Sequence, residues 1–163
     1  QHKEMTPTLK TPKSLTPAET ASLVGLWEAA VRQTHDFLTE ADILFYRDIV
    51  RRSLSQVDLY VLTDDSDTPI AFMGLSSEQI EMLFVRPDEQ GKGYGRRLIE
   101  YACRKKGMKR VDVNEQNPGA RAFYGRMGFR TIGRSETDDY GRPFPILHLE
   151  KEERNHSLLP NRT

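Results

Sequence analysis

Residues 85–98 read VRPDEQGKGYGRRL and are more informative than any other stretch of this chain. The apolar residues before them predict a strand, the glycines predict a loop, and the pattern from Leu98 onward predicts a helix that begins at this loop. The first turn of a helix has backbone N–H groups without intrahelical partners, and the helix dipole adds positive potential there. We therefore expect this loop to bind an anion, most naturally a phosphate ester.

The spacing of the glycines excludes two well-known classes of phosphate-binding loop. A Walker loop requires Ser or Thr directly after its lysine, whereas Gly93 follows Lys92 in this chain. A dinucleotide fingerprint requires Gly-x-Gly-x-x-Gly, whereas Gly91, Gly93 and Gly95 alternate singly. Both classes are therefore excluded, and the pattern that remains is Gln90-x-x-Gly93-x-Gly95.

A second segment adds to this pattern, because glycine-rich turns between a strand and a helix also occur as simple connectors. Residues 117–129 read NPGARAFYGRMGF. With the strand 80–85 and the loop, this segment resembles the GNAT superfamily of acetyl-CoA-dependent N-acetyltransferases, whose second motif reads Asn-x-x-Ala-x-x-Phe-Tyr-x-x-x-Gly-Phe. The resemblance runs from about Leu15 to Lys151 and is specific only within residues 80–129. It is nearest to the small stand-alone bacterial acetyltransferases.

The order of the expected elements is typical of a mixed α/β sheet covered by helices. Helices are expected over residues 17–33 and 40–55, from the glycine-rich loop to Gly107, and from Asn117 to Gly128. Strands are expected over residues 8–12, 59–62, 70–75, 80–85, 111–114, 129–135 and 146–150. Short polar links between the early strands predict antiparallel pairing.

The resemblance implies an α/β (α+β) fold with a mixed, mostly antiparallel sheet of six to seven strands. This sheet would be splayed between its fourth and fifth strands, with helices on both faces. We expect one N-acetyltransferase domain over residues 8–151, a flexible segment over residues 1–7 and a polar tail over residues 152–163.

The same resemblance implies where coenzyme A binds. Backbone N–H groups from about Gly91 to Arg96 would bind its pyrophosphate, since glycines let the main chain approach closely. A backbone N–H near Leu83 would polarise the thioester carbonyl, and the Asn117 side chain would contact the cofactor, cap its helix, or do both. The expected cofactor-binding residues are Leu83, Phe84, Val85, Gln90, Gly91, Lys92, Gly93, Tyr94, Gly95, Arg96, Asn117 and Tyr124.

Tyr124 is the expected general acid. Attack of an amine on acetyl-CoA expels a thiolate, and a phenol beside the sulfur can protonate it. The family places such a tyrosine seven residues after its asparagine, where Tyr124 stands relative to Asn117. The alternative is an aromatic core contact like that expected for Phe123, which should point to a different face of the helix.

The general base is expected to be a carboxylate. Asp112, on the fifth strand, has the offset from Tyr124 at which some family members carry a catalytic glutamate, and its shorter side chain would require a bridging water. Glu81, on the fourth strand, occupies a place where other members carry the base. For each residue the alternative is an exposed strand carboxylate, and Asp112 is placed slightly ahead of Glu81.

The resemblance assigns the acceptor wall to the link between the first two helices and to the final hairpin. The expected substrate-binding residues are His35, Phe37, Asp138 and Tyr140. Carboxylates in both segments would attract a cationic amine. For His35 the alternative is a capping or hydrogen-bonding role.

Composition argues against several classes of partner. The chain has 24 Lys and Arg against 24 Asp and Glu, which argues against bulk electrostatic binding to nucleic acid or to an anionic membrane. The lone Cys103 suits a reducing cytoplasm, where we expect the protein to act. We expect no metal, because His2, His148 and His156 are not grouped with cysteine or carboxylates at metal-ligand spacing.

The resemblance implies an acyltransferase, and we expect it to move acetyl from acetyl-CoA to a primary amine of a small molecule in a direct ternary complex. No serine or cysteine is recognised beside an activating base, so no covalent enzyme intermediate is expected. One alternative is an acyl-CoA-binding sensor without turnover. The other is a related acyl transfer, with a longer acyl group or with a protein N-terminus or lysine as acceptor. The exposed strands of the final hairpin would also allow a homodimer.

Overall fold

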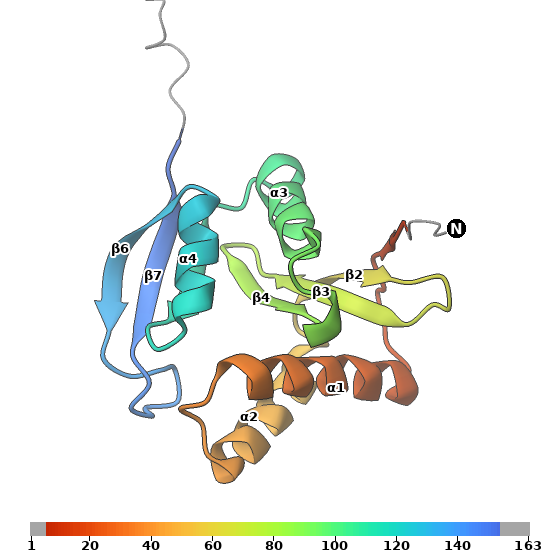
Figure 1. Ribbon diagram of the computed structural model, residues 1–163, viewed down its shortest axis with the longest axis horizontal. Helices are drawn as coiled ribbons and strands as arrows, with labels where there is room; N and C mark the ends of the chain where they lie inside the picture. Colours follow the sequence, from red (N-terminus) through yellow and green to blue (C-terminus); the bar gives the residue numbers. More distant parts are fainter. Residues whose placement is uncertain (1–5, 154–163) are drawn as a thin grey trace, which may run out of the picture. The chain divides into compact units, whose positions relative to one another are not determined.

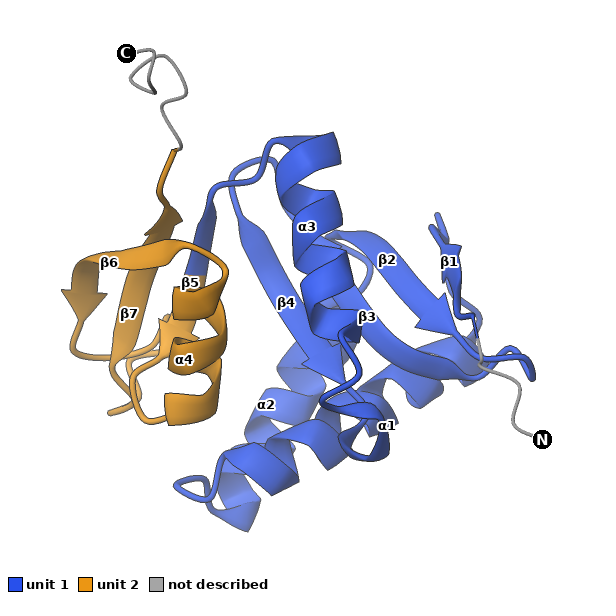
Figure 2. Ribbon diagram, turned by 45° about the horizontal axis from the view of Figure 1, so that its top comes forward, with its two compact units in different colours: residues 1–111 blue, residues 112–163 orange. Residues whose placement is uncertain are grey.

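The computed structural model describes residues 6–153, so most of the predicted end segments 1–7 and 152–163 lie outside the described part. The chain forms two compact units, Gln1–Val111 and Asp112–Thr163, which Figure 2 shows in different colours. The extent of a single domain over residues 8–151 remains a prediction.

Two helices follow the first strand of the first unit, and their starts follow from local side-chain chemistry. Helix α1 (Pro17–Thr34) begins with a capping box, in which the N–H of Glu19 donates to Thr16 Oγ1 at 3.1 Å and the N–H of Thr16 donates to Glu19 Oε1 at 2.8 Å. Helix α2 (Glu40–Ser53) begins with the same arrangement at Thr39 and ends two residues earlier than expected.

Five strands of the sheet lie wholly or partly in the first unit, in the order β1-β2-β3-β4-β5. Their bounds are β1 (Thr8–Lys10), β2 (Asp58–Thr63), β3 (Pro69–Leu75), β4 (Ile80–Val85) and β5 (Arg110–Asn114). The first four pair antiparallel, as the short links predicted. The pair β4–β5 is parallel, with Ile80 opposite Val111.

Helices cover both faces of this sheet, with α1 and α2 on one face and α3 (Tyr94–Lys106) on the other (Figure 2). Strands β2 and β3 are therefore buried on both faces, and their sequences are nearly continuous apolar runs. Phe72 and Met73 on β3 are completely buried. This core positions the end of β4 and the glycine-rich loop that follows it.

The second unit contains the rest of β5, helix α4 (Pro118–Arg126) and the hairpin of β6 (Phe129–Ser135) and β7 (Ile146–Lys151), in the strand order β5-β7-β6. Figure 1 shows α4 packed along this hairpin. Strands β6 and β7 pair antiparallel. Thr131 lies opposite Leu149 and Gly133 lies opposite His148, so two residues of β6 face one residue of β7. This β-bulge at Ile132 bends the strand. The side chains of β6 after the bulge lie on the opposite face from the one they would occupy if the strand alternated regularly from Thr131.

The seven observed strands confirm the predicted mixed, mostly antiparallel sheet. Strands β4 and β6 have the predicted bounds, and the other elements differ at their ends by a few residues. A short 3-10 helix, η1 (Pro87–Glu89), was not predicted and lies between β4 and the glycine-rich loop. Within residues 6–153, no helix combines the length and hydropathy that crossing a bilayer requires.

Candidate active site

The glycine-rich loop has the backbone geometry that its sequence predicts. Gly91 and Gly93 have φ angles of 81° and 87°, in the left-handed region that glycine adopts without strain. A Cβ at either position would meet nothing within 4 Å, so the backbone conformation and not crowding requires glycine. Gly93 is the N-cap of α3, and no side chain of the described residues caps this end of the helix.

The first turn of α3 therefore presents main-chain donors. The N–H of Arg97 donates to the carbonyl of Gly93 at 3.0 Å and so begins the helical ladder. The N–H groups of Tyr94, Gly95 and Arg96 precede it, where an α-helix offers no intrahelical acceptor. Together with the helix dipole, they form the anion-binding geometry expected for a phosphate group.

Arg86 holds the turn that leads into this loop. Its N–H donates to the carbonyl of Ile70 at 2.8 Å, which ties the end of β4 to β3. Its guanidinium donates to Asp88 at 2.8 Å and to Glu89 at 3.2 Å. The Asp88 carboxylate raises the pKa of Arg86 above its ordinary value, so this ion pair persists at any physiological pH.

The cationic side chains of the loop already have acidic neighbours. Lys92 Nζ lies 3.1 Å from Glu89 Oε1, and Arg96 Nε lies 3.1 Å from Glu100 Oε2. Both cations remain largely exposed, at 54% for Lys92 and 69% for Arg96. The pairs are weak because they are solvated, so either cation can turn toward an anionic ligand.

The three β4 residues expected along the cofactor, Leu83, Phe84 and Val85, are all half-buried. Along one edge they pair with β3, where Phe84 lies opposite Phe72 and their ring centroids are 5.7 Å apart. The parallel contact with β5 is formed at Ile80, at the start of β4. The predicted splay beyond this point remains a prediction.

Asn117 caps α4 as predicted, since its Oδ1 accepts from the N–H of Ala120 at 3.1 Å. Tyr124 is buried, with 6% of its surface exposed, and its ring packs edge-to-face against Phe123 at 5.0 Å and Phe129 at 5.4 Å. The aromatic contact named as the alternative for Tyr124 is therefore present. Its role as an acid remains a prediction.

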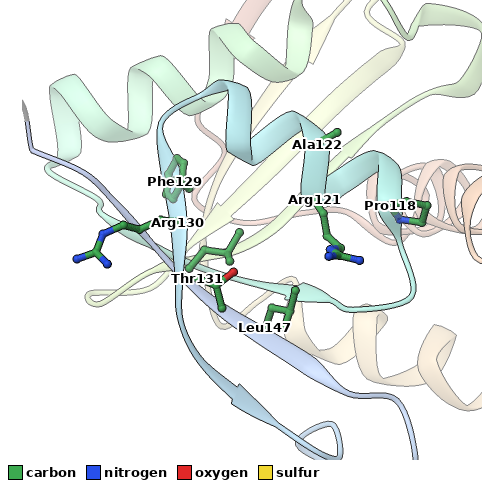
Figure 3. Close-up of a pocket in the computed structure, with 8 residues that line it drawn as sticks. Pro118, Arg121, Ala122, Phe129, Arg130, Thr131 and Leu147 are labelled. Atoms are coloured by element: carbon green, nitrogen blue, oxygen red, sulfur yellow. The ribbon is translucent and has the colours of Figure 1, made fainter.

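A shallow hollow of about 400 Å³ lies between α4 and the hairpin of β6 and β7 (Figure 3). None of its lining residues was predicted as a site residue. They are Pro118, Arg121, Ala122, Phe129, Arg130, Thr131, Leu147 and Leu149. Phe129 also contacts the Tyr124 ring, so the hollow shares one wall with the predicted acid.

Asp112 lies in a hydrogen-bonded row that the sequence analysis did not find. Its Oδ1 is 2.7 Å from His148 Nδ1, and His148 Nε2 is 2.7 Å from Ser135 Oγ. The expectation that no serine lies beside an activating base is therefore wrong. Ser135 and His148 were missed because they lie on separate strands, and only strand order and register bring them together.

Glu81, the second candidate base, is exposed on β4 and accepts a hydrogen bond from Gln79 Nε2 at 3.3 Å. It directly follows Ile80, just as Asp112 directly follows Val111, and these two apolar residues pair in register. The backbone of each candidate base therefore directly follows a residue of the Ile80–Val111 pair, where β4 contacts β5.

The residues expected at the acceptor wall fall in two groups. In the first unit, His35 and Phe37 pack together, with ring centroids 5.2 Å apart. In the second unit, Asp138 Oδ1 accepts from the N–H groups of Tyr140 and Arg142, each at 2.9 Å, and so shapes the hairpin loop. Tyr140 is 52% exposed.

Among residues 6–153, no three His, Cys, Asp or Glu side chains are grouped so that they could hold a metal ion.

Comparison with known proteins identifies the family. The family model described as "Acetyltransferase (GNAT) domain" matches residues 55–131. The peptidyl-lysine N-acetyltransferase YjaB of Salmonella typhimurium LT2 is 40% identical over 131 residues, which cover 80% of this chain and 90% of that protein. This chain belongs to the GNAT acetyltransferase family. It is an acyltransferase, and its family uses acetyl-CoA.

Other relatives of this GNAT chain agree. YjaB of Escherichia coli K12 is 41% identical over 131 residues, which cover 80% of this chain and 89% of that protein. The solution structure of apo YjaB from E. coli superposes with a TM-score of 0.82 at 37% identity, covering 92% of this chain and all of that one. The PaiA N-acetyltransferase of Thermoplasma acidophilum, solved in complex with coenzyme A, shares the fold, with a TM-score of 0.61 at 21% identity, 90% coverage of this chain and 99% of that one.

The first prediction concerns His35, whose pKa is lowered below 6.5 by burial. The folded state therefore favours the neutral ring, whereas the unfolded chain takes up a proton near pH 6.5. We expect the protonation of His35 to have no effect on the free energy of unfolding above pH 6.5. As the pH drops below 6.5 toward the pKa of His35 in the folded state, this free energy should fall. Urea unfolding at pH 7.5 and 5.5 should show a smaller loss for His35→Gln than for wild type. An equal loss in both proteins would contradict the buried neutral ring.

Proposed function

We propose that this GNAT acetyltransferase transfers the acetyl group of acetyl-CoA to the ε-amino group of a lysine in a protein or peptide, by direct attack in a ternary complex. The observation that carries the proposal is the start of α3, where left-handed glycines precede main-chain donors whose geometry suits a phosphate group. The lysine acceptor is supported by two relatives, 40% and 41% identical, that are named peptidyl-lysine N-acetyltransferases.

Coenzyme A binds, in this proposal, along the residues that the sequence analysis named. The N–H groups from Gly91 to Arg96 donate hydrogen bonds to the pyrophosphate, and Lys92 can turn from Glu89 to add charge. The β4 residues from Leu83 to Val85 pair with the pantetheine arm, and Asn117 contacts the cofactor from the start of α4. The N–H groups of the loop suit the ligand because they follow one another along the chain and direct positive dipoles toward an anion.

The chemistry requires the chain to stabilise negative charge twice. The lysine nitrogen attacks the thioester carbonyl, and the N–H of Leu83 stabilises the oxygen as it becomes negative. The C–S bond then breaks, and Tyr124 donates its phenolic proton to the thiolate sulfur. The attacking nitrogen loses its second proton as the amide forms, and this proton restores the Tyr124 phenol. The attacking ammonium must first lose a proton, which we assign to Asp112 or Glu81, the two carboxylates next to the β4–β5 contact.

The acceptor approaches, in this proposal, along His35, Phe37, Asp138 and Tyr140. The aromatic side chains of Phe37 and Tyr140 offer surface for the aliphatic part of a lysine. Asp36 beside His35, and Asp139 beside Tyr140, supply negative charge that attracts the ammonium group.

The second prediction tests the phosphate site. Gly93→Glu should weaken coenzyme A binding roughly tenfold or more, because a carboxylate would stand at the start of α3 and repel the pyrophosphate. Gly107→Glu is the matched control, since Gly107 also has a positive φ, 69°, and open space, at the other end of α3. Calorimetric titration of folded variants measures both. Equal affinities for coenzyme A would mean that the loop does not hold the pyrophosphate.

The third prediction concerns the acid. Tyr124→Phe should lower kcat by about 10²-fold or more with little change in affinity for coenzyme A, because the ring contacts persist and only the proton donor is lost. Tyr101→Phe, on α3, controls for the removal of a phenol elsewhere and should leave kcat unchanged. Thiol release measured at saturating substrates gives the result. An unchanged kcat in Tyr124→Phe would remove this residue from the chemistry.

The fourth prediction concerns the acceptor. Wild-type protein incubated with acetyl-CoA should release thiol with lysine-containing peptides and should yield acetyl-lysine by mass spectrometry. A panel of polyamines, amino acids and aminoglycosides run beside the peptides tests a small primary amine, the first expectation from the sequence. Turnover confined to that panel would replace the lysine assignment. Binding of coenzyme A without release of thiol from any acceptor would favour a sensor.

A further inference from the structure

The row Asp112–His148–Ser135 crosses three neighbouring strands of the second unit, β5, β7 and β6. Asp112 Oδ1 is 2.7 Å from His148 Nδ1, and His148 Nε2 is 2.7 Å from Ser135 Oγ. A carboxylate only accepts hydrogen bonds, so the proton of the neutral ring is on Nδ1. The lone pair on Nε2 then accepts the hydroxyl proton of Ser135. The row therefore directs a base at a hydroxyl group.

This order of residue types is the one that activates serine in many hydrolases. A serine hydroxyl is a weak nucleophile until an adjacent base removes its proton. In such a triad the imidazole takes that proton, while the carboxylate fixes the tautomer of the ring and stabilises the imidazolium. In this chain His148 has the place of the base, and Asp112 has the place of the positioning residue.

The row is open to small molecules from solvent. The side chains of Asp112 and His148 are 32% and 36% exposed, and Ser135 is half-buried. Ser135 is the last residue of β6, which is the edge strand on this side of the sheet. Gly133 lies opposite His148, and a Cβ there would be 3.6 Å from His148 Cδ2, so glycine keeps a side chain off the ring.

We propose that Ser135 is a nucleophilic serine that takes the acyl group from small, activated acyl esters. This activity lies beyond the transfer to lysine and does not depend on it. Ser135 Oγ attacks the ester carbonyl while its proton passes to His148 Nε2. The C–O bond to the leaving group then breaks, and the imidazolium returns the proton to the departing alcohol. Water attacks the acyl-serine by the same route, which releases a carboxylic acid and restores the hydroxyl.

The surroundings of the row favour a short acyl group. Ile146 lies opposite Ser135 and is half-buried, so it offers a small apolar surface beside the hydroxyl. Farther along the same face of the hairpin, Arg130 lies opposite Glu150, and both are charged. The hollow of Figure 3 is on the other face, because side chains alternate along β7 and Leu149 lines it. An acetyl ester fits this setting better than a long apolar chain.

The test uses two electrophiles at mildly alkaline pH, p-nitrophenyl acetate and a fluorophosphonate from which the serine oxygen displaces fluoride. Peptide mapping by mass spectrometry should find both groups on Ser135 of the wild type. His148→Gln should slow labelling about 10²-fold or more, because the base is lost, and Ser135→Ala should abolish it. Ser53→Ala is the matched control, since Ser53 Oγ donates to the carbonyl of Ile49 at 2.7 Å, and it should be labelled as wild type.

The outcomes distinguish a reactive serine from a row that only joins three strands. Absence of label on Ser135, or equal rates of labelling in wild type and His148→Gln, overturns the inference. A ¹⁵N NMR measurement on wild type should find the Nδ1–H tautomer of His148, and an Nε2–H tautomer would overturn the inference without any variant. Lysine acetylation by Ser135→Ala should equal that of wild type, and its loss in a folded variant would overturn the independence of the two activities.

Discussion

The first turn of α3 has main-chain N–H groups that the helix itself cannot satisfy, and much of the candidate site is arranged around them. Gly93 adopts a left-handed conformation at the N-cap, and in the described chain no side chain takes the place of an external acceptor. The end of β4 is tied to β3 by Arg86, so the loop leaves the sheet at a fixed point. A helix start of this kind combines donors and dipole in one place, which suits an anionic ligand.

Local chemistry made much of the fold predictable. The capping box at Thr16 and the glycines that flank α3 lie within a few residues of the structure that they determine, so their patterns could be recognised directly. Strand β4 was predicted with its observed bounds because an apolar run is closed at both ends by polar turns. The 3-10 helix η1 was missed, since three residues after a proline carry too weak a local signal.

The candidate site was predictable only in part, for a related reason. The cap at Asn117 is a local feature and was predicted. The left-handed conformation of Gly91 and Gly93 is local too, but it was not predicted. The partners of Asp112 are not local, because His148 lies 36 residues away and reaches it through strand order. Ser135 depends further on a bulge, which no short pattern in β6 indicates. The roles of Tyr124, Glu81 and the acceptor residues remain predictions, because they concern ligands.

The bulge at Ile132 also bears on how such enzymes diversify. One inserted residue in an edge strand leaves the strand order and the glycine-rich loop untouched, because the bulge takes up the extra residue and the pairing beyond it keeps its register. Deleting Ile132 would join Thr131 directly to Gly133, so Gly133 and Ser135 would keep their face and their partners on β7. Members of one family can thus gain or lose a codon in this strand while the side chains beyond the bulge keep their neighbours.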